Sequence, residues 1–344
     1  MQSIIIKDIQ FNSADEFLHA ISYGGELYPL NSSQYIFRGH SFSWYKLIPS
    51  SLRDDITYLN PYAKRGEGDR LPENIQILNE FYILHYFFKN CDNNGLSVPN
   101  VPRLRRSLYN FYDIQTLCES EYWLPEDLYE IAALAQHYGL PTRLLDWTHD
   151  IKTAIFFALS DYLKEDKNKE IKPIKPDNIV IWALNTTICT NDAFTQMKVK
   201  FLQEENISKN IPAQLYIQTR KRFPLKVIRP QYANNPNLCA QKGLFTLWEV
   251  EKTKINDRNE TQIDETPLDQ LLVEFLSSDQ ELLSYISKPL LYKISIPNRC
   301  LVQLYGFLKE NHIDSSTLFP GYDGILKSIK EDNAISNLTF SSSN

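Results

Sequence analysis

The amino-acid sequence predicts an α+β fold, with helices concentrated in the first half of the chain packed on a mainly antiparallel sheet from the second half. In the first half, apolar residues recur at helical spacing over 125–139 and 149–163. In the second half, segments 178–184, 244–250 and 290–296 are short and rich in β-branched and aromatic residues, as strands are. Helices and strands that are segregated along a chain are typical of the α+β class.

The N-terminal region begins with a strand, a helix and a second strand. The apolar segment 4–9 and the segment 34–38, which reads QYIFR, predict strands. Between them, Ser13 is followed three residues later by Glu16, and this capping-box spacing predicts a helix that begins near Ser13. The folded domain is therefore expected to start at residue 1.

The first half continues with an insertion and two helices. Residues 54–124 are polar, aromatic and mostly helical in pattern, and loop-like pieces interrupt them, so we interpret this region as an insertion. The next helix opens with Pro125 and closes with Gly139, which is the usual polarity of helix signals. In the helix at about 149–163, apolar residues extend beyond one stripe. We therefore expect it to be the most buried helix, with Phe157 inaccessible.

The second half contains another insertion and a helical end. Residues 251–285 are acidic and then helical in pattern, and they separate the last two predicted strands. Residues 300–313 predict an amphipathic helix, and 318–325 predict a turn that enters a short strand or helix. We therefore expect one domain over 1–330, with residues 331–344 as a C-terminal tail.

Composition and charge narrow the classes of function. The 344 residues carry a formal net charge of −6, which gives the chain no general attraction for nucleic acid or anionic membranes. The five cysteines lie too far apart for a zinc motif or a disulfide framework, and the six histidines lack metal-ligand spacing, so we expect no metal. With 11 glycines and no glycine-rich phosphate loop, the pattern excludes a Rossmann or P-loop fold. The longest apolar segment, 154–159, is too short to span a bilayer, so we expect a cytoplasmic protein without membrane contact.

Two charged motifs predict a functional site. The motif FRGH places Arg38 at the end of a predicted strand, and AQHYGLPTRLLDWT at 135–148 carries His137, Arg143 and Asp146 around a turn. Guanidinium groups bind phosphate oxygens in pairs, and histidine and aspartate serve in proton transfer or ligand orientation. We expect the four side chains to converge on one concave surface.

Each of these residues also has an ordinary structural interpretation. Arg38 could form a surface ion pair, Asp146 could cap the helix that begins near Thr148, and Arg143 could pair with Asp146 or with carbonyls at a helix end. His137 lies away from the apolar side of its predicted helix, which disfavours a role in the core. The residue pattern leaves both interpretations open.

Six segments of the chain resemble, in the same order, the motifs of the FRG domain family. They are FRGH (37–40), LIPSSLR (47–53), AQHYGLPTRLLDWT (135–148), AIFFAL (154–159), AQKGLFTLW (240–248) and LFPGYDGI (318–325). The resemblance covers most of residues 30–330 and leaves out the two expected insertions. It implies a bacterial or phage origin. The family is named for a motif, however, and implies no particular reaction.

The pair Arg38-Gly39 also resembles the first motif of ADP-ribosyltransferases. In those enzymes the arginine holds the pyrophosphate or ribose of NAD, which is a substrate, and a later strand with Ser or Thr shapes the nicotinamide pocket. The resemblance implies that Arg38, Gly39 and Arg143 contact NAD and that Thr246 takes the place of the later Ser or Thr.

A carboxylate completes the site that this resemblance implies. In ADP-ribosyltransferases it is typically a late glutamate, which stabilises the oxocarbenium-like state that forms as nicotinamide leaves. Here Asp323 is the late acidic residue in a matching motif, while His137 and Asp146 would orient the ligand or the acceptor. The implied function is NAD-dependent ADP-ribosyl transfer to a protein or nucleic-acid acceptor, by a toxin or phage-defence effector.

Two other functions are compatible with the same residues. A non-catalytic binding module could recognise a phosphorylated ligand or nucleic acid through Arg38, Arg143 and the basic segment 220–229. A hydrolase could use His137 as a general base beside an acidic partner. The sequence names neither the acceptor nor the oligomeric state.

Overall fold

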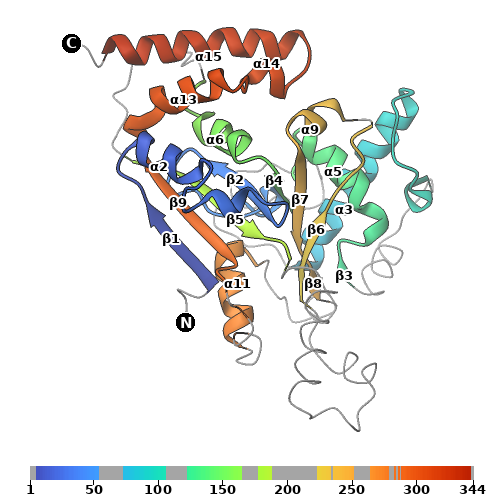
Figure 1. Cartoon of the computed structure of the whole chain (residues 1–344). Helices are drawn as coiled ribbons and strands as arrows, with labels where there is room; N and C mark the ends of the chain where they lie inside the picture. The colour runs from blue at the N-terminus through green and yellow to red at the C-terminus, as the bar shows by residue number, and fades with distance from the viewer. Residues whose placement is uncertain are drawn as a thin grey trace.

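The fold is built on one large sheet (Figure 1). The computed structural model describes residues 5–53, 73–105, 122–164, 177–187, 223–233, 235–251, 264–278, 283, 286 and 288–341. Within them, a seven-stranded sheet has the order β1-β9-β5-β2-β4-β7-β6, and a small sheet pairs β3 with β8. The strands are β1 (Ile6–Gln10), β2 (Tyr35–His40), β3 (Tyr122–Trp123), β4 (Leu144–Thr148), β5 (Asn178–Asn185), β6 (Leu225–Ile228), β7 (Gly243–Trp248), β8 (Val250–Glu251) and β9 (Leu291–Pro297).

The strand pairing confirms the predicted α+β class and the mainly antiparallel sheet. Neighbouring strands of the large sheet are antiparallel except β1 and β9, which are parallel. The sheet also contains β1, β2 and β4 from the first half of the chain. The expectation that the sheet comes from the second half was therefore only partly correct. Cross-strand pairs stabilise a sheet whatever the distance along the chain, and β2 pairs along its whole length with β5.

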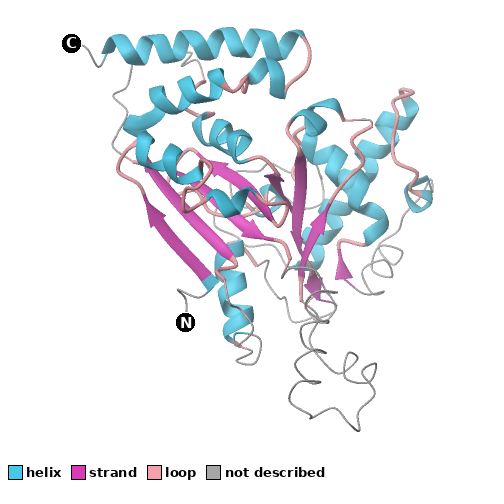
Figure 2. Cartoon of the chain, in the orientation of Figure 1, coloured by secondary structure: helices cyan, strands magenta, loops and turns pink. Residues whose placement is uncertain are grey.

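Helices surround the sheet (Figure 2). The described α-helices are α2 (Ala14–Ile21), α3 (Glu73–Asn93), α5 (Tyr129–His137), α6 (Ile151–Leu159), α9 (Pro236–Ala240), α11 (Leu268–Ser277), α13 (Leu301–Glu310), α14 (Ser315–Leu318) and α15 (Tyr322–Ser341). The predicted start of α2 is confirmed, because the Ser13 hydroxyl accepts a hydrogen bond from the Glu16 N–H at 3.2 Å.

Three apolar clusters hold the helices to the strands. On one side of β2, β5 and β9, the core contains side chains of α2, α6 and α13. On the other side, α11 contributes Leu268, Leu272 and Leu276. A third cluster joins α3 and α5 to residues of β4 and β7. Strand β5 is buried along nearly its whole length, which explains its continuous apolar sequence.

Strand β4 was not predicted, because the sequence analysis treated LLDWT as part of a turn before a helix. In the structure it lies between β2 and β7. Leu145 and Trp147 enter one apolar cluster, while Asp146, between them, is exposed. This alternation is typical of a strand, but it extends over only five residues. The helix that follows is capped by Asp150, whose carboxylate accepts from the Lys152 N–H at 2.9 Å, and Asp146 is not the cap.

Helix α6 packs closely on β2, and a glycine permits the contact. A Cβ at Gly39 would lie 2.0 Å from the carbonyl oxygen of Ala154, so only glycine fits this crossing. The helix is largely buried, as predicted, and Phe156 is inaccessible. Phe157, however, is only partly buried. The expectation of an inaccessible Phe157 was therefore wrong, because two adjacent helical residues point in directions about 100° apart.

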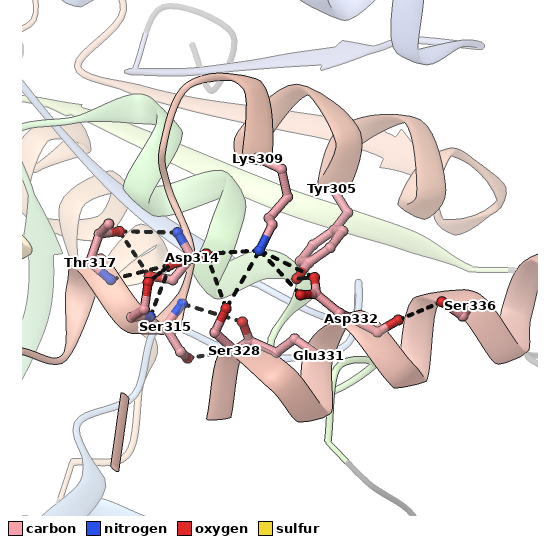
Figure 3. A network of polar contacts seen from close by, with 10 residues as sticks. Tyr305, Lys309, Asp314, Ser315, Thr317, Ser328, Glu331, Asp332 and Ser336 are labelled. Atoms are coloured by element: carbon pink, nitrogen blue, oxygen red, sulfur yellow. Dashed lines mark hydrogen bonds and ion pairs between the residues drawn. The ribbon is translucent and has the colours of Figure 1, made fainter. Parts of the chain in front are cut away.

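The C-terminal helices α13, α14 and α15 are joined by polar contacts (Figure 3). Lys309 of α13 forms ion pairs with Asp314, at the start of α14, and with Asp332 of α15, at 2.9 Å and 3.2 Å. The Ser315 hydroxyl donates to the buried carboxylate of Glu331. Helix α15 continues to residue 341, so residues 331–341, which were expected as a tail, belong to a helix of 20 residues. Residues 330–341 are mostly polar, so the apolar pattern did not predict this part of the helix.

Candidate functional site

A cavity with a volume of 580 Å³ lies beside β2 and β4. These two strands pair at one position only, where Phe37 faces Thr148. The cavity is lined by β2 and β4, the end of α5, helix α6, the segment 41–53 and the region of α9 and β7. We call it the Arg38 cavity. Three of the four residues expected to converge, Arg38, His137 and Asp146, line it, and so does Gly39.

Arg38 is held by two partners and remains partly open. Its Nε donates to His40 Nε2 at 3.1 Å, and its Nη1 donates to the Asp146 carbonyl at 2.8 Å and to Asp146 Oδ2 at 3.4 Å. Among the described residues, Nη2 has no hydrogen-bond partner. Burial lowers the pKa of Arg38 from its ordinary value of 12.5, and Asp146 partly opposes this shift, but an arginine stays protonated in proteins. The cavity therefore contains a fixed positive charge with one nitrogen free to donate.

His40 positions this guanidinium, a role that the sequence analysis missed. Its Nε2 accepts from Arg38 and so carries no proton, which places the proton on Nδ1 of a neutral ring. Burial and the charge of Arg38 lower the pKa of His40 from 6.5 to about 3. His40 is therefore neutral at physiological pH and acts as an acceptor that orients Arg38. The FRGH motif contained this signal, since residues two apart in a strand point to the same side.

Asp146 is fixed by Gln136, which the sequence analysis also missed. Gln136 Nε2 donates to Asp146 Oδ2 at 3.0 Å and to the Leu144 carbonyl at 3.3 Å. Gln136 Oε1 accepts from the hydroxyls of Thr142 and Ser50, at 2.8 Å and 3.3 Å. These contacts tie the last turn of α5 to β4. The Asp146 side chain is nevertheless 55% exposed, against 15% for Arg38, so a ligand can reach the carboxylate.

His137 lines the same cavity at the end of α5. Burial lowers its pKa from the ordinary 6.5, and the Asp146 carboxylate opposes the shift. The ring is therefore mostly neutral at pH 7, which is the form that can accept a proton.

Aromatic and basic side chains form the rest of the wall. Trp44, Tyr45, Phe157 and Phe319 contribute rings, with Phe157 and Phe319 edge to face at 6.5 Å between centroids. Lys46 and Arg53 add positive charge at the same cavity, and Asp161 adds a second carboxylate. His40 and Gln136 lie within the two charged motifs, whereas Trp44, Tyr45, Lys46 and Arg53 follow FRGH and lie outside both. Their spacing along the chain gave no signal.

Arg143 lies outside the Arg38 cavity and has a buried structural role. Its Nε donates to Glu80 Oε2 at 2.7 Å, and the two side chains are only 5% and 4% exposed. Glu80 also accepts from the Trp123 indole N–H, from Ser51 and from Gln76. Neither a pairing with Asp146 nor a place beside Arg38 is observed. The physical reason is that Glu80 comes from α3, within the expected insertion, where the sequence pattern showed no partner.

Thr246 and Asp323 also lie away from the Arg38 cavity. Thr246 pairs with Leu145 across β7 and β4, and its buried hydroxyl accepts from the Trp147 indole N–H at 2.8 Å. Its neighbour Phe245 lines the cavity instead, because successive residues of a strand point to opposite faces. Asp323 is exposed in the first turn of α15. Of the basic segment 220–229, residues 220–222 lie outside the described residues, and the others do not line this cavity.

The comparisons with known proteins find a family for part of the chain. The family model described as FRG domain matches residues 33–167. The chain therefore contains an FRG domain over this range, which includes Arg38, His40, Gln136, His137 and Asp146. No curated protein and no solved structure matches the chain, so the resemblance to ADP-ribosyltransferases gains no support from them.

The part of the chain that the structure describes contains no group of three or more His, Cys, Asp or Glu residues arranged to hold a metal ion. It also contains no helix with both the length and the apolar character needed to cross a membrane.

Proposed function

We propose that the Arg38 cavity binds a phosphorylated, nucleotide-like ligand. The observation that carries this proposal is the state of Arg38, whose guanidinium is fixed by His40 and Asp146 while Nη2 keeps its hydrogens available. A preorganised guanidinium loses little conformational entropy when an anionic oxygen binds. Lys46 and Arg53, at the same cavity, would attract further phosphate charge.

The remainder of the cavity suits the apolar part of such a ligand. Its volume of 580 Å³ falls within the range of ligand sites, roughly 300–1,000 Å³. Trp44 and Tyr45 are exposed rings at the cavity wall, and Phe42 stacks on Trp44 with centroids 4.5 Å apart. Aromatic faces bind nucleobases by stacking. The cavity therefore offers a cationic group for a phosphate and aromatic rings for a nucleobase, and a nucleotide carries both.

A second function, ADP-ribosyl transfer from NAD, is favoured by Asp146 and His137 at the same cavity. The bond between the ribose and nicotinamide breaks with its electron pair leaving on nicotinamide, and a carboxylate stabilises the cation left on the ribose. Asp146 takes this role in place of Asp323. The acceptor's nucleophilic atom then attacks the ribose, and neutral His137 removes its proton. The acceptor is a protein, a nucleic acid or water, and the first two would suit a toxin or phage-defence effector.

Calorimetry with NAD and with ADP-ribose, alongside an assay of nicotinamide release, tests both functions. Arg38→Lys keeps the charge but loses the fixed geometry, so affinity should fall by about 1.5–3 kcal/mol, the scale of a hydrogen bond to a charged group. Asp146→Asn should lower nicotinamide release and change NAD affinity by less than about threefold, because the carboxylate acts mainly in the transition state.

A matched pair of control variants comes from the exposed ion pair of Arg105 and Asp92, 2.9 Å apart and away from the Arg38 cavity. Arg105→Lys and Asp92→Asn should change neither quantity. Binding of both ligands without nicotinamide release, even with bacterial lysate as a source of acceptors, would leave the binding function and exclude the transferase. If the wild-type protein binds neither ligand, both proposals fail.

A further inference from the structure

Helix α15 carries an apolar stripe on its outer side. Tyr322, Ile325, Leu326 and Ile329 follow the spacing i, i+3, i+4, i+7 and therefore share one face of the helix. Tyr322 is 89% exposed, and each of the other three is at least 50% exposed. We call these four residues the α15 stripe. A continuous apolar face of this kind on a surface helix marks an interaction surface.

The orientation of the stripe is fixed by the opposite face of the helix. Ser328 and Glu331 are buried and contact α14, since Ser328 donates to Asp314 Oδ2 at 3.0 Å and Glu331 accepts from Ser315. Gly324 permits a close approach, because a Cβ there would lie 1.9 Å from the Phe319 carbonyl oxygen. Figure 3 shows the contacts of Ser328 and Glu331 with Asp314 and Ser315, and Figure 1 shows α15 at the outer edge of the molecule. The stripe therefore points away from the domain.

The size of the stripe matches a small protein interface. It exposes on the order of 500 Å² of apolar surface, since one aromatic side chain alone accounts for roughly 150–250 Å². Two such surfaces in contact would remove on the order of 1,000 Å² from water, about the lower limit for a specific interface. The expected affinity is therefore micromolar rather than nanomolar.

The charged residues beside the stripe favour a second copy of α15 as its partner. Exposed Asp323 and Lys330 are seven residues apart and lie on the same flank of the stripe. When two copies of a helix pack antiparallel, the same flank of each faces the other, so Asp323 of one copy lies opposite Lys330 of its partner, twice by symmetry. Leu326 then meets Leu326 near the axis. We infer that α15 is the interface of a homodimer, formed by antiparallel packing of this stripe on a second copy.

The flanking charges disfavour a membrane surface as the occupant. Two exposed acids, Asp323 and Asp332, accompany two exposed lysines, Lys327 and Lys330, whereas a helix that binds anionic lipid carries an excess of basic residues. Lys330 already has a contact within its own chain, so the intermolecular pair would exchange partners. The charge pairs therefore fix the antiparallel direction, and the apolar contact supplies the affinity.

The full-length protein tests this inference by sedimentation over a hundredfold range of concentration. The wild type should pass from monomer to dimer, and Leu326→Glu should weaken the association by about tenfold or more, since it places two charges at the axis. Leu96→Glu is the matched control, because Leu96 is 61% exposed and Leu326 is 57% exposed. A wild type that stays monomeric throughout, or a dimer that both substitutions affect equally, overturns the inference.

Charge exchange tests the antiparallel arrangement. Asp323→Lys alone and Lys330→Asp alone each place like charges opposite each other and should weaken the dimer several-fold. The double variant restores opposite charges at both positions and should recover most of the wild-type association. Failure of the double variant to recover overturns the antiparallel pairing. None of these residues lines the Arg38 cavity, so ligand binding should be unchanged.

Discussion

The two arginines of the charged motifs form ion pairs of opposite character. Arg143 and Glu80 are 2.7 Å apart and almost fully buried. Arg38 and Asp146 are 3.4 Å apart, and the Asp146 side chain is more than half exposed. Glu80 is further surrounded by donors from Trp123, Ser51 and Gln76. The first pair is complete within the protein, whereas the second keeps a carboxylate and one guanidinium nitrogen within reach of a ligand.

This difference shows that the partner of an arginine decides its role more than the motif that contains it. A buried carboxylate saturated by protein donors holds its arginine in the structure and has no capacity left for a ligand. An exposed carboxylate contributes little to stability but remains available for chemistry. Mutations of the two pairs should therefore have effects of different size on stability.

The largest expected effect is that of Arg143→Met. Removing the cation leaves Glu80 charged and buried without its partner, which should cost about 3–5 kcal/mol of unfolding free energy. Arg38→Met removes the partner of a carboxylate that water can reach, so it should cost about 1 kcal/mol or less. Urea denaturation followed by circular dichroism measures both.

A double variant separates the buried charge from packing. Glu80→Gln combined with Arg143→Met leaves no unpaired charge, so it should recover part of the stability lost in Arg143→Met. Equal losses for Arg143→Met and Arg38→Met would contradict the distinction between the two pairs.

The second prediction applies the same contrast to adjacent residues of α6. Phe156 is 2% exposed in the core, whereas Phe157 is partly buried and lines the Arg38 cavity. Phe156→Ala should cost about 3–5 kcal/mol, and Phe157→Ala less than about 2 kcal/mol, because part of its ring surface already faces the cavity. Similar losses in urea denaturation would show that Phe157 belongs to the core.

Much of the fold could be predicted because it depends on local patterns. The helix cap at Ser13 and the strands near 178–184 and 290–296 were found from spacing and composition, and the structure places them within a residue or two. Strand β4 was missed because five residues with one exposed aspartate give too short an alternation. The length of helix α15 was missed because its apolar spacing ends at Ile329, and the residues that continue the helix are mostly polar.

The candidate site could be predicted only in part, from the unusual charge of its two motifs. Arg38 and Asp146 were named correctly as neighbours at a cavity, since both motifs carry unusual charge. Thr246 was wrongly expected at the cavity, which its neighbour Phe245 lines instead. Which of the two side chains faces the cavity depends on the register between β7 and β4. Arg143 was misplaced because Glu80 comes from a helix more than 60 residues away in the chain. Such pairings are properties of the packed molecule.

The third expected effect concerns His40 and the pH dependence of the Arg38 pair. The pKa of His40 is about 3 in the folded protein, against 6.5 ordinarily, so as pH falls below 6.5 the unfolded state binds a proton that the folded state does not. Stability should then decrease by up to roughly 1.4 kcal/mol per pH unit, or about 2–3 kcal/mol between pH 6.5 and about pH 4.5.

The variant His40→Gln tests this pH dependence. Its side-chain oxygen can accept a hydrogen bond from Arg38 Nε, and it has no proton to gain. Between pH 6.5 and about pH 4.5, the unfolding free energy of His40→Gln should therefore fall by about 2–3 kcal/mol less than that of the wild type. His19→Gln, at an exposed histidine of α2, is the matched control. Stability curves of the wild type and His40→Gln that stay parallel from neutral to acid pH would mean that His40 takes up its proton in the fold, and Arg38 would then lack the neutral acceptor that fixes it.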